Sequence, residues 1–242
     1  MEWQDQAIIL SAKPHGENNV VVELLTENHG RHAGMVRGGR SKKNRPMLQP
    51  GNHVSAVWKA RLVEHLGFYT IELIQAHAAV LMEDRAALAG ISSLCTLARY
   101  LPERDPHPGL FEACLLILQY IENREIWPPL LIRWEMELLN ELGFQLDLSE
   151  CAATGSKENL IYVSPKSGKA VSEVAGEPYK DKLLRIPDFL RDGAGDEGAL
   201  EEINLGFQLT GYFLEKYILQ VRNQTLPETR SRLLGYLKSQ TS

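Results

Sequence analysis

The first 75 or so residues carry short apolar and β-branched runs, each bounded by turn-forming residues. None of the runs lasts long enough for a helix, so the pattern predicts strands. Breaks fall at Lys13-Pro14-His15-Gly16, Asn28-His29-Gly30 and Gln49-Pro50-Gly51-Asn52. The predicted strands are Ala7–Leu10, Asn19–Thr26, His32–Val36, His53–Ala60 and Phe68–Ile74.

Five short strands expose unpaired edges unless the sheet closes on itself. An OB-type β-barrel removes most of these edges, and we expect one over residues 1–80. Side chains alternate between the two faces of a strand, and this alternation favours the barrel core for Trp58 and Phe68.

The apolar period changes to three or four residues from about Leu81. One helical face runs from Leu88 to Leu101 and ends before a group of prolines. Further helical stripes cover residues 111–121 and 131–142, the second opening at Trp127-Pro128-Pro129 and ending at Gly143. A long helix from Leu200 to Val221 and a short one after Leu226 complete the pattern.

Helical periodicity lapses between residues 149 and 176, where Leu160–Val163 faces Ala170-Val171 across a polar turn. This pattern predicts a small β-hairpin, and the helices on both sides are expected to pack into one domain. The predicted fold class is therefore α+β. It combines an N-terminal five-stranded OB-type β-barrel, residues 1–80, with an all-helical domain, residues 81–242, that carries a hairpin insertion at 149–176.

The net charge of −5 argues against a nucleic-acid-binding protein, but the distribution of charge reverses that impression. No Asp or Glu lies between Arg31 and Val63. A phosphate backbone responds to the local positive field rather than to total charge. The alternative is a solvated basic loop. The cations of this stretch are Arg31, Arg37, Arg40, Lys42, Lys43, Arg45, Lys59 and Arg61.

The segment from Gly38 to Arg45 follows directly on a predicted strand, so its cations are expected to project from the barrel rim. Few aromatic residues are available to stack on bases, so binding is expected to be mainly electrostatic, with weak sequence preference. The available aromatic residues are Trp3, Trp58, Phe68 and Tyr69.

Signatures of catalysis are missing from the sequence: it has no G-x-x-x-x-G-K-[ST] loop, no G-x-S-x-G elbow and no H-E-x-x-H motif. We therefore expect no enzymatic activity and no cofactor. A nuclease that uses scattered carboxylates such as Glu83 and Asp84 with a divalent ion is one alternative. The histidines are scattered, which favours surface positions over metal ligation.

The sequence has no apolar run of about 18 residues and no signal peptide pattern, so we expect a soluble, cytoplasmic protein without membrane contact. Three cysteines occur, and two of them sit in apolar helical patterns. Reduced thiols are therefore expected.

Arg133 lies among Leu131, Ile132 and Trp134, and Glu137 follows one helical turn later. That spacing suits an ion pair. The alternative is that the guanidinium lies beside an apolar groove and receives the C-terminal carboxylate of a partner. The sequence leaves both interpretations open.

The order of several short segments resembles the bacterial DNA repair protein RecO family over nearly the whole chain. No single segment is a strict motif, so the resemblance depends on their joint order. The segments are Trp3–Leu10, Gly30-Arg31, Gly38-Gly39-Arg40-Ser41-Lys42, Leu48-Gln49-Pro50, Leu101-Pro102-Glu103, Arg133-Trp134-Glu135, Leu142-Gly143-Phe144 and Cys151-Ala152-Ala153-Thr154-Gly155.

The resemblance implies an OB-fold, a helical domain and a recombination mediator that works without nucleotide hydrolysis. Such proteins bind single- and double-stranded DNA, anneal complementary strands, join RecR, and help RecA load onto strands coated by the single-stranded-DNA-binding protein, whose C-terminal tail they contact. RecF is a further candidate partner. By this match Arg133 is the candidate for the tail carboxylate. The candidate DNA contacts are Arg31, Arg37, Arg40, Lys42, Lys43 and Arg45.

Many members of the family bind zinc through two C-x-x-C pairs around the hairpin, and here the sequence departs from that pattern. Cys151 remains, but Thr154 takes the second position and the later pair falls near Ser172 and Ala175. One thiolate cannot supply the four ligands that zinc needs, so we predict no metal. The remaining alternative function is a protein-binding adaptor of a repair complex without direct DNA contact.

Overall fold

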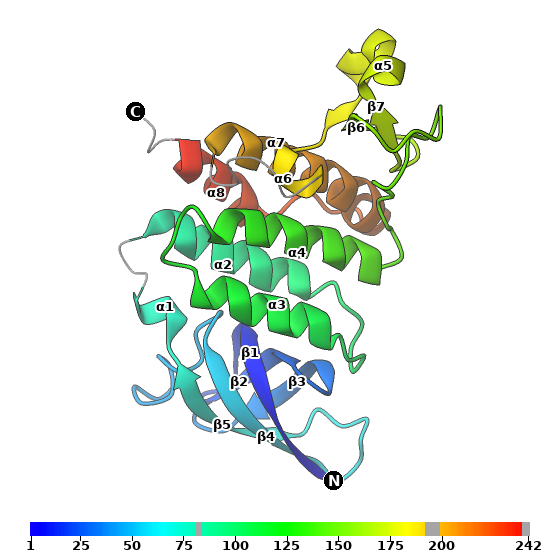
Figure 1. Cartoon of the computed structure of the whole chain (residues 1–242). Helices are drawn as coiled ribbons and strands as arrows, with labels where there is room; N and C mark the ends of the chain where they lie inside the picture. Colours follow the sequence, from blue (N-terminus) through cyan, green and yellow to red (C-terminus); the bar gives the residue numbers. More distant parts are fainter. Residues whose placement is uncertain (81–83, 192–198, 239–242) are drawn as a thin grey trace. The chain divides into compact units, whose positions relative to one another are not determined.

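The computed structural model describes residues 1–80, 84–191 and 199–238 (Figure 1). The chain forms two compact units, Met1–Glu122 and Asn123–Ser242. The division between these units differs from the expected domain boundary at residue 80, which stays a prediction. None of the helices in the described ranges is long and apolar enough to cross a membrane.

The first unit contains a closed five-stranded barrel with strand order β1-β2-β3-β5-β4. This order and closure confirm the predicted OB-type barrel. All pairings are antiparallel except the short parallel contact between β3 and β5, where Met35 is paired with Phe68. The strands are β1 Glu2–His15, β2 Asn19–Thr26, β3 Gly30–Val36, β4 His53–Lys59 and β5 Phe68–Gln75.

Strand β1 is much longer than the predicted Ala7–Leu10 because it serves two neighbours. Its first half, Glu2–Ile8, pairs with β4, and its second half, from Ala7 to His15, pairs with β2. A register shift between Ile9 and Ser11 interrupts the pairing with β2, just past the two residues, Ala7 and Ile8, that both neighbours share. The predicted run Ala7–Leu10 therefore covers this overlap and the register shift, and it misses both ends of the strand.

The barrel core confirms the prediction for Trp58 and contradicts it for Phe68. Trp58 is 1% exposed and donates from Nε1 to the Leu66 carbonyl at 3.0 Å. Phe68 is 40% exposed, because its neighbours on β5, Tyr69 and Ile71, take the interior positions. Side chains alternate strictly along a strand, so an interior Tyr69 directs Phe68 outward.

The expected surface position of the histidines is wrong for His32, His77 and His107, which are all buried. The Nδ1 atom of His32 lies 2.8 Å from the Tyr69 hydroxyl. Burial, aided by the charge of Arg104, lowers the pKa of His32 to about 4. The imidazole is therefore neutral at physiological pH and acts as a core side chain.

Three helices follow the barrel in the described residues of the first unit: α1 His77–Val80, α2 Arg85–Ala98 and α3 Pro108–Gln119. The Asp84 carboxylate caps α2 by accepting from the backbone N–H groups of Ala86 and Ala87, both at 3.0 Å. That role in capping offers no support for the nuclease alternative, whose other residue, Glu83, lies outside the described residues. Helix α2 packs on β1, where the Cys95 thiol lies 3.5 Å from the Ile9 carbonyl.

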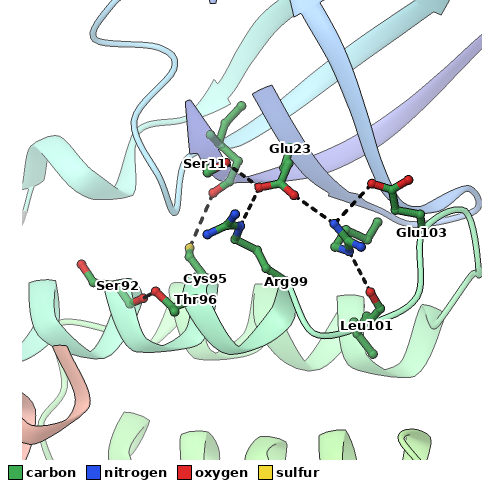
Figure 2. A network of polar contacts seen from close by, with 10 residues as sticks. Ser11, Glu23, Ser92, Cys95, Thr96, Arg99, Leu101 and Glu103 are labelled. Atoms are coloured by element: carbon green, nitrogen blue, oxygen red, sulfur yellow. Dashed lines mark hydrogen bonds and ion pairs between the residues drawn. The ribbon is translucent and has the colours of Figure 1, made fainter. Parts of the chain in front are cut away.

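A polar network around Glu23 fastens α2 and the turn after it to the barrel (Figure 2). The Glu23 carboxylate accepts from Ser11 Oγ at 2.7 Å, Arg31 Nη1 at 2.9 Å and Arg99 Nε at 2.5 Å. Arg31 Nε also donates to the Leu101 carbonyl at 2.7 Å. Burial raises the pKa of Glu23, but the Ser11 hydrogen bond and the two arginines outweigh it, so the pKa lies below its ordinary value.

The second unit combines helices with a small three-stranded sheet. Strands β6 and β7 form the predicted hairpin, and β8, a two-residue strand without a periodic signal, adds a third strand that the sequence did not indicate. Val221, the predicted end of the long helical stripe, is 78% exposed, because the α-helix ends at Phe213 and continues as π and 3-10 turns. The elements are α4 Trp127–Glu141, β6 Leu160–Val163, β7 Ala170–Ser172, α5 Glu173–Gly176, the 3-10 helix Glu177–Lys182, β8 Leu184–Arg185, α6 Asp188–Arg191, α7 Leu200–Phe213, the π turn Leu214–Leu219, the 3-10 turn Gln220–Arg222 and α8 Glu228–Lys238.

A buried ion pair joins three helices of the second unit. Arg230 of α8 donates from Nε and Nη2 to the two Glu135 carboxylate oxygens of α4, both at 2.9 Å. Arg230 Nη2 also lies 3.0 Å from the Thr210 hydroxyl of α7 and 2.6 Å from the Phe207 carbonyl. Both charged side chains are at most 2% exposed, so their charges depend on each other for compensation.

We expect Glu23→Ala to lower the free energy of unfolding by about 2 kcal/mol, between the values for exposed and fully buried pairs. The loss leaves Arg31 and Arg99 facing each other without their shared carboxylate. Urea denaturation at pH 7 measures the change. Glu2→Ala, which breaks the exposed Glu2–Lys59 pair, is the control and should leave unfolding close to wild type.

The Glu23 contribution also has a pH dependence of known sign. Because the folded-state pKa lies below the ordinary 4.5, the contribution is present above about pH 4.5 and is lost as the pH falls through the folded-state pKa. An equal effect of Glu23→Ala at pH 7 and pH 3 would contradict this assignment.

Arg230→Met should lower the free energy of unfolding by about 3–5 kcal/mol, because it leaves the Glu135 charge buried without compensation. The double variant Glu135→Leu, Arg230→Met removes both charges and should recover most of the loss. Chemical denaturation of the two variants beside wild type tests this. A double variant no more stable than Arg230→Met would show that shape, rather than charge, governs the site.

Candidate nucleic-acid interface

The cations predicted to bind DNA lie mainly on one connection, between β3 and β4. We call residues 37–45 the basic segment. Its second residue is Gly38, whose φ of +62° suits glycine. Two hydrogen bonds from its backbone N–H groups connect it to the start of β2. Gly38 N–H donates to Asn19 Oδ1, and Arg40 N–H donates to the Asn18 carbonyl, both at 3.2 Å.

Successive turns give the basic segment an internal structure. The backbone N–H groups of Asn44 and Arg45 donate to the Ser41 carbonyl at 3.2 and 3.0 Å, and the Leu48 N–H donates to the Asn44 carbonyl at 3.2 Å. The Leu48 side chain is buried in the barrel core. The barrel thus presents these cations on an ordered backbone rather than on an unanchored loop.

Five of the six candidate DNA contacts are exposed on the basic segment: Arg37, Arg40, Lys42, Lys43 and Arg45. Within the described part of the chain, the side chains of Lys42, Lys43 and Arg45 form no hydrogen bond or ion pair. The Arg40 guanidinium donates to the carbonyls of Gly16 and Glu17 at 3.1 and 2.9 Å. Arg40 therefore also holds the β1–β2 turn.

The structure separates Arg31 from the other candidates. Arg31 lies near the start of β3 and Arg37 just past its end, six residues or about 20 Å along the strand. The Arg31 guanidinium is occupied by Glu23 and the Leu101 carbonyl. The sequence could not reveal this difference, because the charge pattern contains no information about distant partners.

Two cavities flank the basic segment. The first, of about 380 Å³, places Arg40 and Arg45 beside apolar Val20 and Leu48. The second, of about 500 Å³, is lined by Arg37 and Lys59 together with Phe68 and Ile71. We name the second one the Phe68 cavity.

The aromatic residues expected to be available to bases are mostly inside the barrel. Trp58 and Tyr69 belong to the core, and half-buried Trp3 stacks on His29 with ring centroids 4.0 Å apart. Of these four aromatic side chains, only Phe68 is exposed, and the Arg37 guanidinium lies 4.1 Å from its ring centroid.

Arg133 lies on α4 in the other unit, and its surroundings include an apolar ring. Its Nη2 donates to the Phe189 carbonyl at 3.0 Å, and its guanidinium carbon lies 5.2 Å from the Phe189 ring. Part of the guanidinium is thus bound to α6. The role of Arg133 toward a partner's carboxylate stays a prediction.

Three of the four residues at the degraded zinc positions, Cys151, Thr154 and Ser172, converge in the structure. The Ser172 N–H donates to Cys151 Sγ at 3.3 Å, and Thr154 also bonds to that sulfur. In the described ranges, no group of three or more His, Cys, Asp or Glu side chains is placed to hold a metal ion. Hydrogen bonds to the Cys151 sulfur therefore connect the loop that contains Cys151 and Thr154 to Ser172 of β7.

These hydrogen bonds change the acidity of Cys151. Burial raises the pKa of the thiol, but bonds from the Ser172 and Thr154 side chains and from nearby backbone N–H groups outweigh burial and bring the pKa to about 6. Cys95, buried against β1, shows the opposite effect, because burial raises its pKa to about 12.

Comparison with known proteins covers nearly the whole chain. The family models described as "Recombination protein O N terminal" and "Recombination protein O C terminal" match residues 1–77 and 82–226. The DNA repair protein RecO of Methylorubrum populi is 49% identical over 240 residues, covering 97% of this chain and 98% of that protein. The DNA repair protein RecO of Brucella abortus is 50% identical over 235 residues, covering 97% and 95%.

The Cys151 thiol should ionise with a midpoint near pH 6, which the ultraviolet absorbance of the thiolate measures as a difference between wild type and Cys151→Ser. A midpoint near the ordinary value of 9 would contradict the hydrogen-bonded cluster. Metal analysis of the same preparation tests the zinc prediction separately. One zinc per chain, with a thiolate signal insensitive to pH, would refute it.

Proposed function

The chain belongs to the recombination protein O (RecO) family, and from that premise we propose that it acts in DNA repair as a non-enzymatic recombination mediator. In this role it binds single- and double-stranded DNA through the rim of the barrel. It anneals complementary strands and helps RecA load onto strands coated by the single-stranded-DNA-binding protein. It acts on the DNA of the nucleoid, in the cytoplasm.

The observation that carries this proposal is the basic segment itself. Its five exposed cations sit on a backbone that is hydrogen-bonded to the barrel, in a stretch of sequence without carboxylates. Each cation that neutralises a phosphate releases condensed counterions, which makes binding favourable and sensitive to salt. The local field therefore outweighs the net charge of −5.

Annealing needs contacts that hold strands without fixing them in one register. Lysine and arginine contacts to phosphates meet this need, because they recognise charge and carry little sequence information. The proposed interface consists mainly of such contacts. A strand held in this way can shift until complementary bases meet.

Partner binding is assigned to the second unit. We propose that Arg133 receives the C-terminal carboxylate of the single-stranded-DNA-binding protein, since a planar guanidinium suits bidentate contact with a carboxylate. The buried Phe189 ring beside it supports the guanidinium from within the unit. RecR, and RecF as a further candidate, complete the proposed set of partners.

The adaptor without DNA contact is supported by a different observation. Leu62, Val63 and Leu66, in the loop between β4 and β5, are 39–50% exposed. Clustered exposed apolar side chains favour a protein partner at this end of the barrel. In the adaptor the basic segment is solvated and contributes no affinity for DNA.

A charge-reversal variant distinguishes the two functions. Lys42→Glu, Lys43→Glu, Arg45→Glu spares Arg40, which holds the β1–β2 turn. Loss of three phosphate contacts should weaken single-strand binding about 100-fold at 0.1 M salt and lower the slope of log affinity against log salt by about 2. Fluorescence anisotropy of labelled single- and double-stranded oligonucleotides at several salt concentrations measures both quantities.

The matched control is Lys157→Glu, Lys166→Glu, Lys182→Glu, which makes the same charge change at exposed positions of the second unit. The mediator predicts nearly wild-type DNA binding for this control. Equal losses in both triple variants would indicate a non-specific response to net charge. Absence of DNA binding by wild type would favour the adaptor.

A further inference from the structure

Phe68 faces outward because the barrel leaves it no inward alternative. Inside the barrel the Tyr69 ring packs against Gly34 so closely that a Cβ at Gly34 would lie 2.4 Å from ring carbons. The turn before Phe68 is fixed as well, since Gly67 has φ of +65° and its backbone carbonyl accepts from Met35 N–H at 3.1 Å. Phe68 is thus an exposed aromatic ring on a rigid support.

The surroundings of Phe68 combine aromatic, cationic and apolar groups. The Arg37 guanidinium lies over the ring, and Lys59 lines the same cavity of about 500 Å³. Val36, Met47 and Ile71 supply its apolar walls. Lys59 Nζ pairs with Glu2 at 2.8 Å, but both side chains are more than half exposed, and such a pair is weak enough to exchange for a phosphate.

We propose that the Phe68 cavity receives an unpaired nucleobase of a single DNA strand, which stacks on the Phe68–Arg37 pair. Every base has a π face, so an aromatic ring and a guanidinium plane can bind it without reading sequence. Arg37 and Lys59 lie where they can contact the flanking phosphates. Because Arg37 also begins the basic segment, a strand bound along that segment leads directly to the cavity.

The consequence is a preference for single strands. The bases of a duplex are paired and stacked in its interior, so a duplex contacts the basic segment through phosphates but leaves the cavity empty. This inference deepens the proposed DNA-binding function and rests on it. Phe68 then contacts the unpaired base directly, and the cations of the basic segment supply affinity for either form of DNA.

The test compares a thymidine oligonucleotide with an abasic oligonucleotide of equal length, which has the same phosphates and no bases. Phe68→Leu keeps an apolar side chain and removes the π face. We expect it to weaken binding of the thymidine oligonucleotide about 5- to 10-fold and to leave the abasic oligonucleotide, the duplex and the salt slope unchanged. Phe68→Trp should retain the preference for bases.

Leu62→Ala, in the adjacent loop, is the control for general loss of exposed apolar surface and should bind like wild type. If Phe68→Leu binds thymidine and abasic oligonucleotides with the wild-type ratio, the inference is overturned. The proposed function survives that result provided that the Lys42, Lys43, Arg45 reversal still weakens DNA binding and lowers its salt slope. If wild type binds neither oligonucleotide, both the inference and the proposed function fail.

Discussion

The carboxylate of Glu23 is the contact on which the arrangement of the first unit depends. It lies on β2 and accepts from side chains of β1, β3 and Arg99, the residue that follows α2, so one acidic group connects three strands of the barrel to the end of the helix packed against them (Figure 2). Two guanidinium groups share it, and Glu103 adds a second, more distant carboxylate 3.6 Å from Arg31. Partial burial strengthens these contacts, because fewer water molecules compete for the charges.

This network also decides which arginines remain for a ligand. Arg31 and Arg37 belong to the same run of basic residues, yet one is bound to Glu23 and the other is exposed at the opposite end of β3. Arg40 is intermediate, since it is exposed but bonded to two backbone carbonyls. Structural and ligand-binding arginines therefore differ in their partners and not in their local sequence.

The second unit is also held together by polar side chains that satisfy one another's hydrogen bonds. Arg230 and Glu135 are fully buried and satisfied by each other, by Thr210 and by a backbone carbonyl. Gly211 makes room for this pair, because a Cβ there would lie 2.6 Å from the Arg230 guanidinium. At the small sheet, hydrogen bonds to the Cys151 sulfur join Thr154 and Ser172. Both clusters bring together elements that lie far apart in the sequence.

The sequence alone determined the order and type of most elements and the positions of the helix ends near Trp127 and Gly143, because these features depend on local periodicity and local backbone preference. Closure of the five strands into a barrel was also predictable, because a closed sheet leaves fewer unpaired strand edges. Only the tertiary structure decided that Phe68 faces outward, that His32 is buried, that β8 joins the small sheet, and that Arg31 is bound to Glu23. Each of these outcomes depends on residues distant in the sequence. The Tyr69 ring contacts His32, for example, and the Glu23 carboxylate binds Arg31. Alternation determines which side chains share a face of a strand, but the packing of the other strands determines which of the two faces lies in the barrel core.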